Sequence, residues 1–120
     1  MNAACTTDLS VPIVDDDPDI TDLLRMMLQE QFPELHSTAS LPDVLTEMES
    51  FHPDVVLVDF NLPGSNGAEG VAAIGDSDKE VTIIGMSGEF TNGSTMQREG
   101  ANDFIAKPFR MGDLMRVMPA

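Results

Sequence analysis

Four short apolar runs alternate along the chain with segments whose apolar residues recur at helical spacing. The runs cover Val11–Val14, Val55–Val58, Val81–Met86 and Phe104–Ala106, and acidic or glycine-rich turns bound them. Residues 34–38 form a weaker candidate strand. Strands that alternate with helices are typical of α/β proteins with a parallel sheet. The pattern therefore predicts one parallel α/β unit.

The clearest helical segment follows the first apolar run. Its apolar residues have the period of an amphipathic helix, and they are Ile20, Leu23, Leu24, Met27, Leu28 and Phe32. Asp17 precedes the segment as a cap, and Pro18 lies in the first turn, where its missing N–H has no helical partner to lose. A second helix is expected from Ser40, because Ser40 and Asp43 have capping-box spacing, with Asp in place of the usual Glu.

Three further helices are expected, and two of them are weakly patterned. One covers Ala68–Ile74, and another lies between residues 94 and 100, where Met96 is the only obvious apolar anchor. The last covers Met111–Met118 and ends before a proline. Its methionines and leucine lie on one side, which favours core packing over a groove for a partner.

Some residues interrupt these patterns. Pro12 lies in the first apolar run, where it removes a donor from the ladder, so we expect the strand to begin after it or to carry a bulge. Asn66-Gly67 and Asn92-Gly93 are typical of hairpin turns, but the flanking patterns favour turns in the loops of an α/β fold.

The length of 120 residues suits one domain, and the composition limits what that domain can bind. The formal net charge of -15 would repel a polyanion over most of the surface, so we expect no direct binding of nucleic acid. Residues 1–10 are polar and are expected to form a flexible leader, in which Cys5 has no second cysteine to pair with. No apolar stretch is long enough to cross a bilayer, so we expect a soluble cytoplasmic protein that does not bind membranes.

Acidic residues directly follow two of the apolar runs. Asp15 and Asp16 come after Val11–Val14, and Asp59 comes after Val55–Val58. Because ligands of open α/β sheets bind at the carboxyl ends of the strands, these carboxylates converge if the two strands are neighbours. Like charges that close would raise one another's pKa unless a cation neutralised them. Mg²⁺ suits such a site, since it prefers oxygen ligands and is often held by one or two carboxylates and a phosphate.

Two other strand ends carry polar residues that suit the same chemistry. Ser87 ends the run Val81–Met86, and Lys107 follows Phe104–Ala106, so both side chains are expected to point into the same crevice. A carboxylate nucleophile, a metal ion, a hydroxyl and an ammonium could together bind a phosphoryl group and offset the charge on its oxygens. The residues therefore indicate phosphoryl transfer to an aspartate.

Four short motifs, one after each of four strands, resemble those of the response-regulator receiver family. They are VDDDP at 14–18, VDFNLP at 58–63, Ser87, and KPF at 107–109. The match spans residues 11–118. Four elements in the same order at four successive strand ends make the resemblance specific, although each residue taken alone would more often be an ordinary cap, turn or surface residue.

The resemblance implies a role for each matching residue around the phosphoryl group. Asp59 would be the phosphoacceptor, Lys107 would contact the phosphoryl group, and Ser87 would donate a hydrogen bond to one of its oxygens. The family's aromatic switch position falls on Phe104, which would move inward as Ser87 is drawn toward the phosphate. The surface over the last two strands and helices would then change shape and meet a partner.

The resemblance also implies a metal site and two residues that affect the lifetime of the phosphoryl group. Asp15, Asp16 and Asp59 would hold Mg²⁺ together with the backbone carbonyl of Asn61. The two positions that influence phosphoryl lifetime in the family are occupied by Asn61 and Glu89.

For the fold, the family implies a flavodoxin-like, doubly wound five-stranded parallel sheet in the strand order 2-1-3-4-5, with helices on both faces. The receiver domain would cover residues 11–120. It would accept phosphate from a histidine kinase or phosphotransfer protein and signal to an output domain or partner protein. It would not be an enzyme in the usual sense, because it would catalyse only its own phosphotransfer and dephosphorylation.

Other functions have less support in the sequence. A receiver-like module that binds partners without phosphorylation would keep the same fold and acidic pocket. A phosphatase or phosphotransferase for a small substrate would need a second general acid, and no residue suggests one. An EF-hand would require Gly and Glu where Ile20 and Met26 stand. His36 and His52 are far apart, match no hydrolase triad and are expected at the surface.

Overall fold

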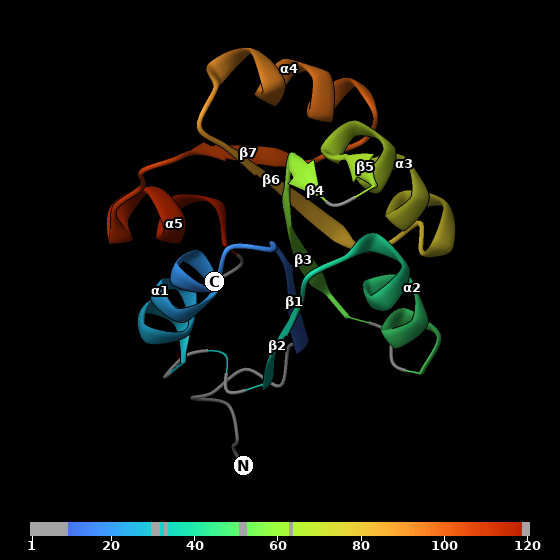
Figure 1. Cartoon of the computed structure of the whole chain (residues 1–120), viewed down its shortest axis with the longest axis horizontal. Coiled ribbons are helices and arrows are strands. Elements are labelled where there is room, and N and C mark those ends of the chain that lie inside the picture. The colour runs from blue at the N-terminus through green and yellow to red at the C-terminus, as the bar shows by residue number, and fades with distance from the viewer. Residues whose placement is uncertain (1–9, 30–31, 33, 51–52, 63, 119–120) are drawn as a thin grey trace.

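The computed structural model describes residues 10–29, 32, 34–50, 53–62 and 64–118. Five parallel strands form one sheet in the order β2-β1-β3-β6-β7 (Figure 1). Their bounds are β1 Ser10–Val14, β2 Glu34–Thr38, β3 Val55–Asp59, β6 Thr82–Ser87 and β7 Asp103–Ala106. In chain order this is the arrangement 2-1-3-4-5, so the predicted flavodoxin-like topology is confirmed.

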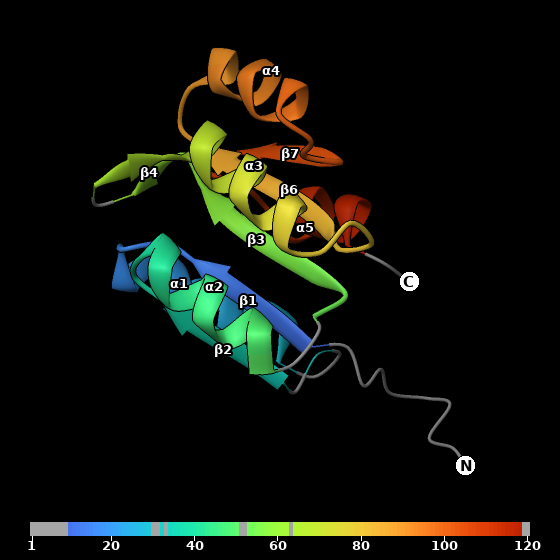
Figure 2. The same ribbon diagram turned by 90° about the vertical axis from the view of Figure 1, so that its right-hand side faces the viewer.

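Five helices cover the two faces of this sheet (Figures 1 and 2). They are α1 Pro18–Leu28, α2 Leu41–Ser50, α3 Gly67–Ser77, α4 Phe90–Arg98 and α5 Met111–Val117. Buried residues of α1 and α5 share one core cluster, whereas those of α2, α3 and α4 share another. The two clusters lie on opposite faces of the sheet, as a doubly wound fold requires.

The central strand β3 shows why these apolar runs form a parallel sheet. All five of its residues are buried, and successive side chains alternate between the two core clusters. Val55 and Leu57 pack with α1 and α5, whereas Val56 and Val58 pack on the other face. A strand covered by helices on both sides has no polar face, which is why its sequence is apolar without interruption.

Helix bounds differ from the predicted ones where the sequence pattern is weak. Helix α3 begins at Gly67, and Asn66 is its N-cap: the Asn66 side chain accepts from the Glu69 N–H at 3.0 Å, while the Glu69 carboxylate accepts from the Asn66 N–H at 3.1 Å. Helix α4 begins at Phe90 and contains Asn92-Gly93, so the interpretation of that pair as a turn is wrong. Tertiary contacts described below outweigh the low helix propensity of these residues.

The first strand also differs from expectation. It runs through Pro12 without a bulge, in continuous register with β2, where Pro12 pairs with His36. Pairing of β1 with β3 begins only at Ile13, so the proline lies just before that ladder, where a missing donor removes little pairing. A short antiparallel hairpin of β4 Asn61–Leu62 and β5 Ser65–Asn66, which the sequence pattern did not predict, follows β3.

Three predictions about individual positions have mixed outcomes. Leu114 of α5 and Met118, the C-cap of this helix, are buried, and Met115 packs against the core, but Met111 is 45% exposed, so the core prediction is wrong for Met111. His36 is half-buried on β2 and has an interaction partner, so it is not a free surface residue. Residues 1–9 of the expected leader, which include Cys5, and His52 lie outside the described residues, whereas Ser10 is the first residue of β1. No helix within the described ranges has the length and apolar character needed to span a membrane.

Candidate functional site

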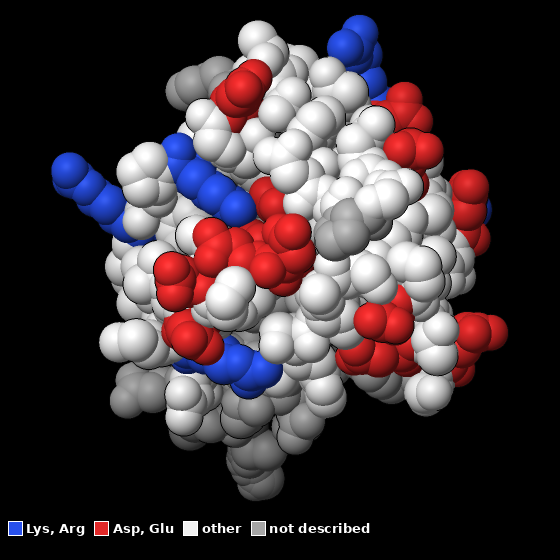
Figure 3. Space-filling view, in the orientation of Figure 1, with Lys and Arg blue, Asp and Glu red and all other residues white. Residues whose placement is uncertain are grey.

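Three carboxylates meet at the carboxyl ends of the two central strands. Asp15 follows the last residue of β1, Asp59 ends β3, and these strands pair directly. Asp15, Asp16 and Asp59 each offer an oxygen that lies within 4.8 Å of the others. Asp15 and Asp59 are buried, with 3% and 4% of their surface exposed, whereas Asp16 is exposed. The predicted convergence is therefore confirmed, and Figure 3 shows acidic side chains gathered in the middle of this face.

The start of α1 orients the first carboxylate. The Asp15 N–H donates to the Thr38 carbonyl of β2 at 3.1 Å, and the Asp17 N–H donates to Asp15 Oδ1 at 2.9 Å. Asp17 itself caps α1, since its side chain accepts from the Asp19 N–H at 2.9 Å. The run of aspartates therefore has two separate uses: Asp15 and Asp16 belong to the carboxylate cluster, and Asp17 stabilises the helix.

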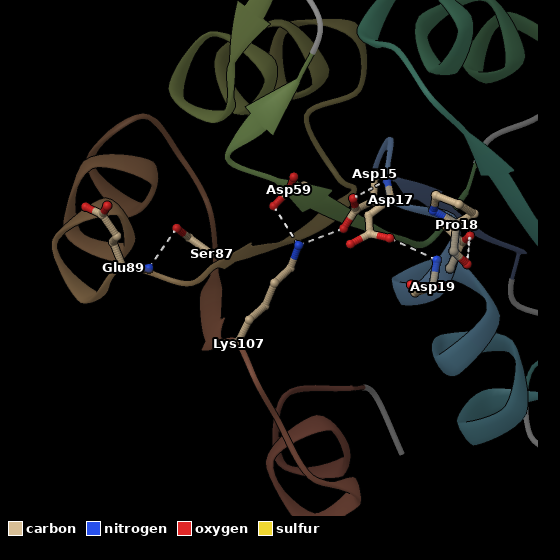
Figure 4. Close-up of polar contacts among 9 residues, drawn as sticks. Asp15, Asp17, Pro18, Asp19, Asp59, Ser87, Glu89 and Lys107 are labelled. Atoms are coloured by element: carbon tan, nitrogen blue, oxygen red, sulfur yellow. Dashed lines mark hydrogen bonds and ion pairs between the residues drawn. The ribbon is translucent and has the colours of Figure 1, made fainter.

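Lys107 joins the two buried carboxylates. Its ammonium lies 2.8 Å from Asp15 Oδ2 and 2.9 Å from Asp59 Oδ1 (Figure 4). The residue follows β7, and its backbone N–H donates to the Ser87 carbonyl at 2.8 Å, which ties the loop to the end of β6. The peptide bond between Lys107 and Pro108 is cis. Lys107 therefore points into the crevice as predicted.

Burial and crowding set the protonation behaviour of this cluster. Burial raises the pKa of Asp59 above its usual range; the hydrogen bond from Lys107 opposes this effect, and the nearby charge of Asp15 adds to it. Burial by itself would lower the pKa of Lys107, but hydrogen bonds to Asp15 and Asp59 outweigh that effect and raise it. Lys107 therefore stays an ammonium, and ionised Asp59 is held in an unfavourable environment.

The donor set of the cluster fits a hard divalent cation. All three groups supply carboxylate oxygens, and within the described residues this is the one group of three or more potential ligands close enough to hold a metal ion. Three carboxylates against one ammonium leave an excess of negative charge in a half-buried site. Oxygen ligands and excess negative charge are what Mg²⁺ requires, and softer transition metals lack their preferred ligands here.

Ser87 lies at the end of β6 but does not point into the crevice, contrary to the prediction. It is 1% exposed, and its Oγ accepts from the Glu89 N–H at 3.1 Å and from Asn92 Nδ2 at 2.9 Å. Figure 4 shows the hydroxyl directed toward Glu89 and away from Asp59. Two donors at the start of α4 therefore hold the side chain in this orientation. Asn92 is a residue that sequence analysis missed, because it had been assigned to a turn.

The remaining predicted positions surround the cluster. Phe104 is a half-buried residue of β7 and packs closely against α4, so that a Cβ atom on Gly93 would lie 2.7 Å from its Cδ2. Asn61 is exposed on β4, and exposed Glu89 is the N-cap of α4, although its side chain makes no capping hydrogen bond. The roles that the resemblance implies for these residues stay predictions.

Comparisons with known proteins agree with this geometry. The family model described as "Response regulator receiver domain" matches residues 11–118. The CAI-1 autoinducer sensor kinase/phosphatase CqsS of Vibrio cholerae is 34% identical over 101 residues, which are 80% of this chain and 15% of that protein. The DNA-binding response regulator MtrA of Mycolicibacterium smegmatis is 29% identical over 105 residues, which are 86% of this chain and 46% of that protein.

A solved structure extends the comparison to the fold. The chemotaxis response regulator CheY4 of Vibrio cholerae superposes with a TM-score of 0.83 at 26% identity, covering 93% of this chain and 100% of that one. By contrast, this chain spans less than half the length of CqsS and MtrA, so the other activities of those proteins do not follow from the match. The chain belongs to the response regulator receiver family, whose members act in two-component phosphorelay signalling.

Proposed function

We propose that the chain receives a phosphoryl group on Asp59 from a histidine kinase or a histidine phosphotransfer protein and thereby changes a surface that binds a partner. The observation that carries this proposal is the contact of Lys107 with both Asp59, at 2.9 Å, and Asp15, at 2.8 Å, within the three-carboxylate cluster. An ammonium at that position can bind a phosphoryl oxygen while one oxygen of Asp59 attacks phosphorus.

The two oxygens of Asp59 have different surroundings. Oδ1 is bound by Lys107, whereas Oδ2 takes part in no hydrogen bond with the residues that the structure describes. We assign Oδ2 as the nucleophile. Its attack forms an O–P bond as the P–N bond of the donor phosphohistidine breaks, so the carboxylate becomes an acyl phosphate and the imidazole leaves with the bonding electron pair. Lys107 then remains within reach of the new phosphate.

The metal in this proposal is Mg²⁺, held by Asp15, Asp16, Asp59 and the backbone carbonyl of Asn61. Bound Mg²⁺ would offset the charge on the phosphoryl oxygens during transfer. Two features support this assignment: Asp15 is fixed by the Asp17 N–H, and Asp16 is open to solvent, where a metal ion and its waters can enter.

The switch in the proposal consists of Ser87 and Phe104. The Ser87 side chain would rotate to donate a hydrogen bond to a phosphoryl oxygen, and Phe104 would move into the space that this rotation leaves. Exposed Asn61 and Glu89, which occupy the two positions that the resemblance associates with phosphoryl lifetime, would set the lifetime of the acyl phosphate. The domain would thus catalyse only its own phosphotransfer and dephosphorylation.

The proposed partners are proteins. A net charge of -15 disfavours direct contact with nucleic acid, so any DNA binding would belong to an output domain or partner. A cytoplasmic location, where kinases of this kind would donate phosphate, is part of the same proposal.

Intact mass spectrometry after incubation with phosphoramidate tests the proposal. We expect the mass of one phosphoryl group to be added to the wild type only with Mg²⁺, and no gain for Asp59→Asn. Asp54→Asn is the matched control, since Asp54 is exposed at the opposite end of β3, and it should behave as the wild type. Folded wild-type protein that gains no mass would instead favour a module that binds partners without phosphorylation.

A further inference from the structure

The amide of Asn92 joins the predicted switch serine to α4. Asn92 Nδ2 lies 2.9 Å from Ser87 Oγ, and the same oxygen accepts from the Glu89 N–H at 3.1 Å. We propose that Asn92 is a positioning residue that holds Ser87 in its resting orientation, away from Asp59, and that phosphorylation must break this contact. The inference rests on the proposed function of Asp59.

The direction in which the hydroxyl points explains why the two orientations compete. A serine oxygen has two lone pairs and one proton. Asn92 and Glu89 each donate to this oxygen, so both lone pairs are used on the side of α4. A phosphoryl oxygen can only accept, and it lies on the side of Asp59, toward which the hydroxyl does not point (Figure 4). Ser87 must therefore rotate about its Cα–Cβ bond, which carries Oγ away from the Asn92 amide.

The helix that carries Asn92 has low intrinsic helix propensity and depends on contacts outside the helix, so a single hydrogen bond can bias its first turn. Its sequence, FTNGSTMQR, contains Gly and several residues of low helix propensity. The N-cap residue Glu89 makes no side-chain capping bond. Met96 is a fully buried anchor, and its side chain fills the space over Gly85, where a Cβ would lie 2.7 Å from Sδ. The bond from Asn92 thus ties the first turn of a marginal helix to the site.

A neighbouring contact connects the same turn to the aromatic residue. Gly93 is buried against the ring of Phe104, whose Cδ2 and Cγ would lie 2.7 and 2.9 Å from a Cβ at that position. Asn92 and Gly93 therefore contact Ser87 and Phe104 from adjacent positions of α4. When the bond between Asn92 and Ser87 breaks, the first turn of α4, which also packs on Phe104, is freed. This one hydrogen bond can therefore restrain both Ser87 and Phe104.

Loss of the Asn92 contact should favour the phosphorylated conformation. A hydrogen bond of this kind shifts an equilibrium by roughly twofold to tenfold. We expect Asn92→Ala to tighten the apparent affinity for beryllofluoride, a mimic of the phosphoryl group, by that factor in the presence of Mg²⁺. Thr91→Ala is the matched control: Thr91 is exposed in the same turn, and the change raises helix propensity in the same way. It should leave the affinity unchanged.

A double-mutant cycle separates positioning from a general effect on α4. Asn92→Ala is also made in Ser87→Ala protein, where the side chain has no hydroxyl to hold, and there it should no longer change the affinity. The signals of the Asn92 side-chain amide, followed by ¹⁵N NMR, should move away from their resting positions both when the wild type is saturated with beryllofluoride and when Ser87 is replaced. These signals report the contact itself.

The possible results are distinct. An unchanged or weaker affinity of Asn92→Ala, or the same gain in the Ser87→Ala background or in Thr91→Ala, would overturn the proposal for Asn92 alone. Wild-type protein that does not bind beryllofluoride with Mg²⁺ would overturn the function proposed for Asp59, and the role of Asn92 with it.

Discussion

Two buried carboxylates bound to one ammonium dominate the energetics of the site at the scale of single residues. Asp15 and Asp59 lie within hydrogen-bond distance of Lys107 but are 3% and 4% exposed, so each loses hydration that the contact only partly replaces. The buried carboxylates therefore lower the stability of the metal-free fold, and a bound cation would offset their charge. Substitutions of these charged residues should therefore change the free energy of unfolding measurably.

Asp59→Asn is expected to stabilise the metal-free protein. Burial raises the pKa of Asp59 above its ordinary value of 3.8, so the folded chain binds this proton more tightly than the unfolded chain does. Stability is therefore lost as the pH rises from the pKa that Asp59 has in the unfolded chain through its raised pKa in the folded chain. We expect a gain of about 1 kcal/mol for Asp59→Asn at pH 7, or about 4 °C in melting temperature.

Thermal unfolding in EDTA at pH 4 and pH 7 checks this prediction. The difference between Asp59→Asn and the wild type should be larger at pH 7 than at pH 4, and Mg²⁺ should reduce it by stabilising the wild type. Asp54→Asn, which removes an exposed carboxylate, should not differ from the wild type. A lower melting temperature for Asp59→Asn in EDTA would be inconsistent with this description of the carboxylate.

Lys107→Met is expected to destabilise the metal-free protein by about 1–3 kcal/mol, because Asp15 and Asp59 would be left buried without their ammonium partner. Mg²⁺ should restore part of the loss, since a divalent cation supplies the missing positive charge. Urea unfolding with and without Mg²⁺ measures both effects. Lys79→Met, which removes an ion pair with Asp76 whose side chains are 78% and 80% exposed, should change stability by less than about 0.5 kcal/mol.

At the scale of elements, the helices differ in how they are held. Helix α3 has a complete capping box, whereas α4 has no side-chain cap and a sequence of weak helix formers. Helix α4 is instead held by tertiary contacts at Asn92, Gly93 and Met96. This difference suits a fixed helix after the β4–β5 hairpin and a more adjustable one beside Ser87 and Phe104, the residues of the proposed switch.

Asn66→Ala is expected to destabilise the fold by about 1 kcal/mol through the loss of the α3 cap. The substitution removes the bond that the Asn66 side chain accepts from the Glu69 N–H at 3.0 Å, whereas the Glu69 carboxylate can still accept from the backbone N–H of residue 66. Urea unfolding should show a lower midpoint with an unchanged slope. Asp76→Ala, an exposed change near the other end of α3, provides the comparison. Equal stability of the Asn66→Ala variant and wild type would mean that the cap contributes little.

Met96→Ala is expected to cost about 2–5 kcal/mol, because a fully buried side chain would leave a cavity between α4 and the sheet. Gly85 and Gly67 lie against this side chain and have no Cβ to fill the space. Met26→Ala makes the same change on α1 at a residue that is 79% exposed, and should cost less than about 0.5 kcal/mol. Similar losses for the two variants would contradict the role of Met96 as an anchor.

The success of sequence-based prediction also differs between elements. The apolar strands of the parallel sheet and the convergence of Asp15, Asp16 and Asp59 were predictable, because uninterrupted apolar runs mark buried parallel strands and strand ends meet at one edge. Helix α4 was misplaced, since its own residues favour a turn and only its contacts with β6 and β7 make it helical. The orientation of Ser87 was likewise not predictable, because it depends on the Asn92 amide, which the sequence pattern had placed in a loop.

At the scale of the whole molecule, topology brings together residues that are distant in sequence. Lys107 lies 92 positions from Asp15 and 48 from Asp59, yet one ammonium contacts both, because β1, β3 and β6 are neighbours and β7 follows β6 at the edge. The carboxyl edge of the sheet thus holds the acidic cluster, the lysine and the serine (Figure 4). Helices on both faces of the sheet flank this edge.

The most direct test of the central claim is to locate the phosphoryl group. Wild-type protein is phosphorylated with phosphoramidate and Mg²⁺ and then treated with borohydride, which reduces an acyl phosphate of aspartate to homoserine, and tandem mass spectrometry identifies the modified residue. We predict homoserine at position 59 only, with none in a sample prepared without Mg²⁺. Homoserine at Asp15 or Asp16 instead of Asp59 would contradict the account, because the contact of Lys107 with Asp59 would then not mark the nucleophile.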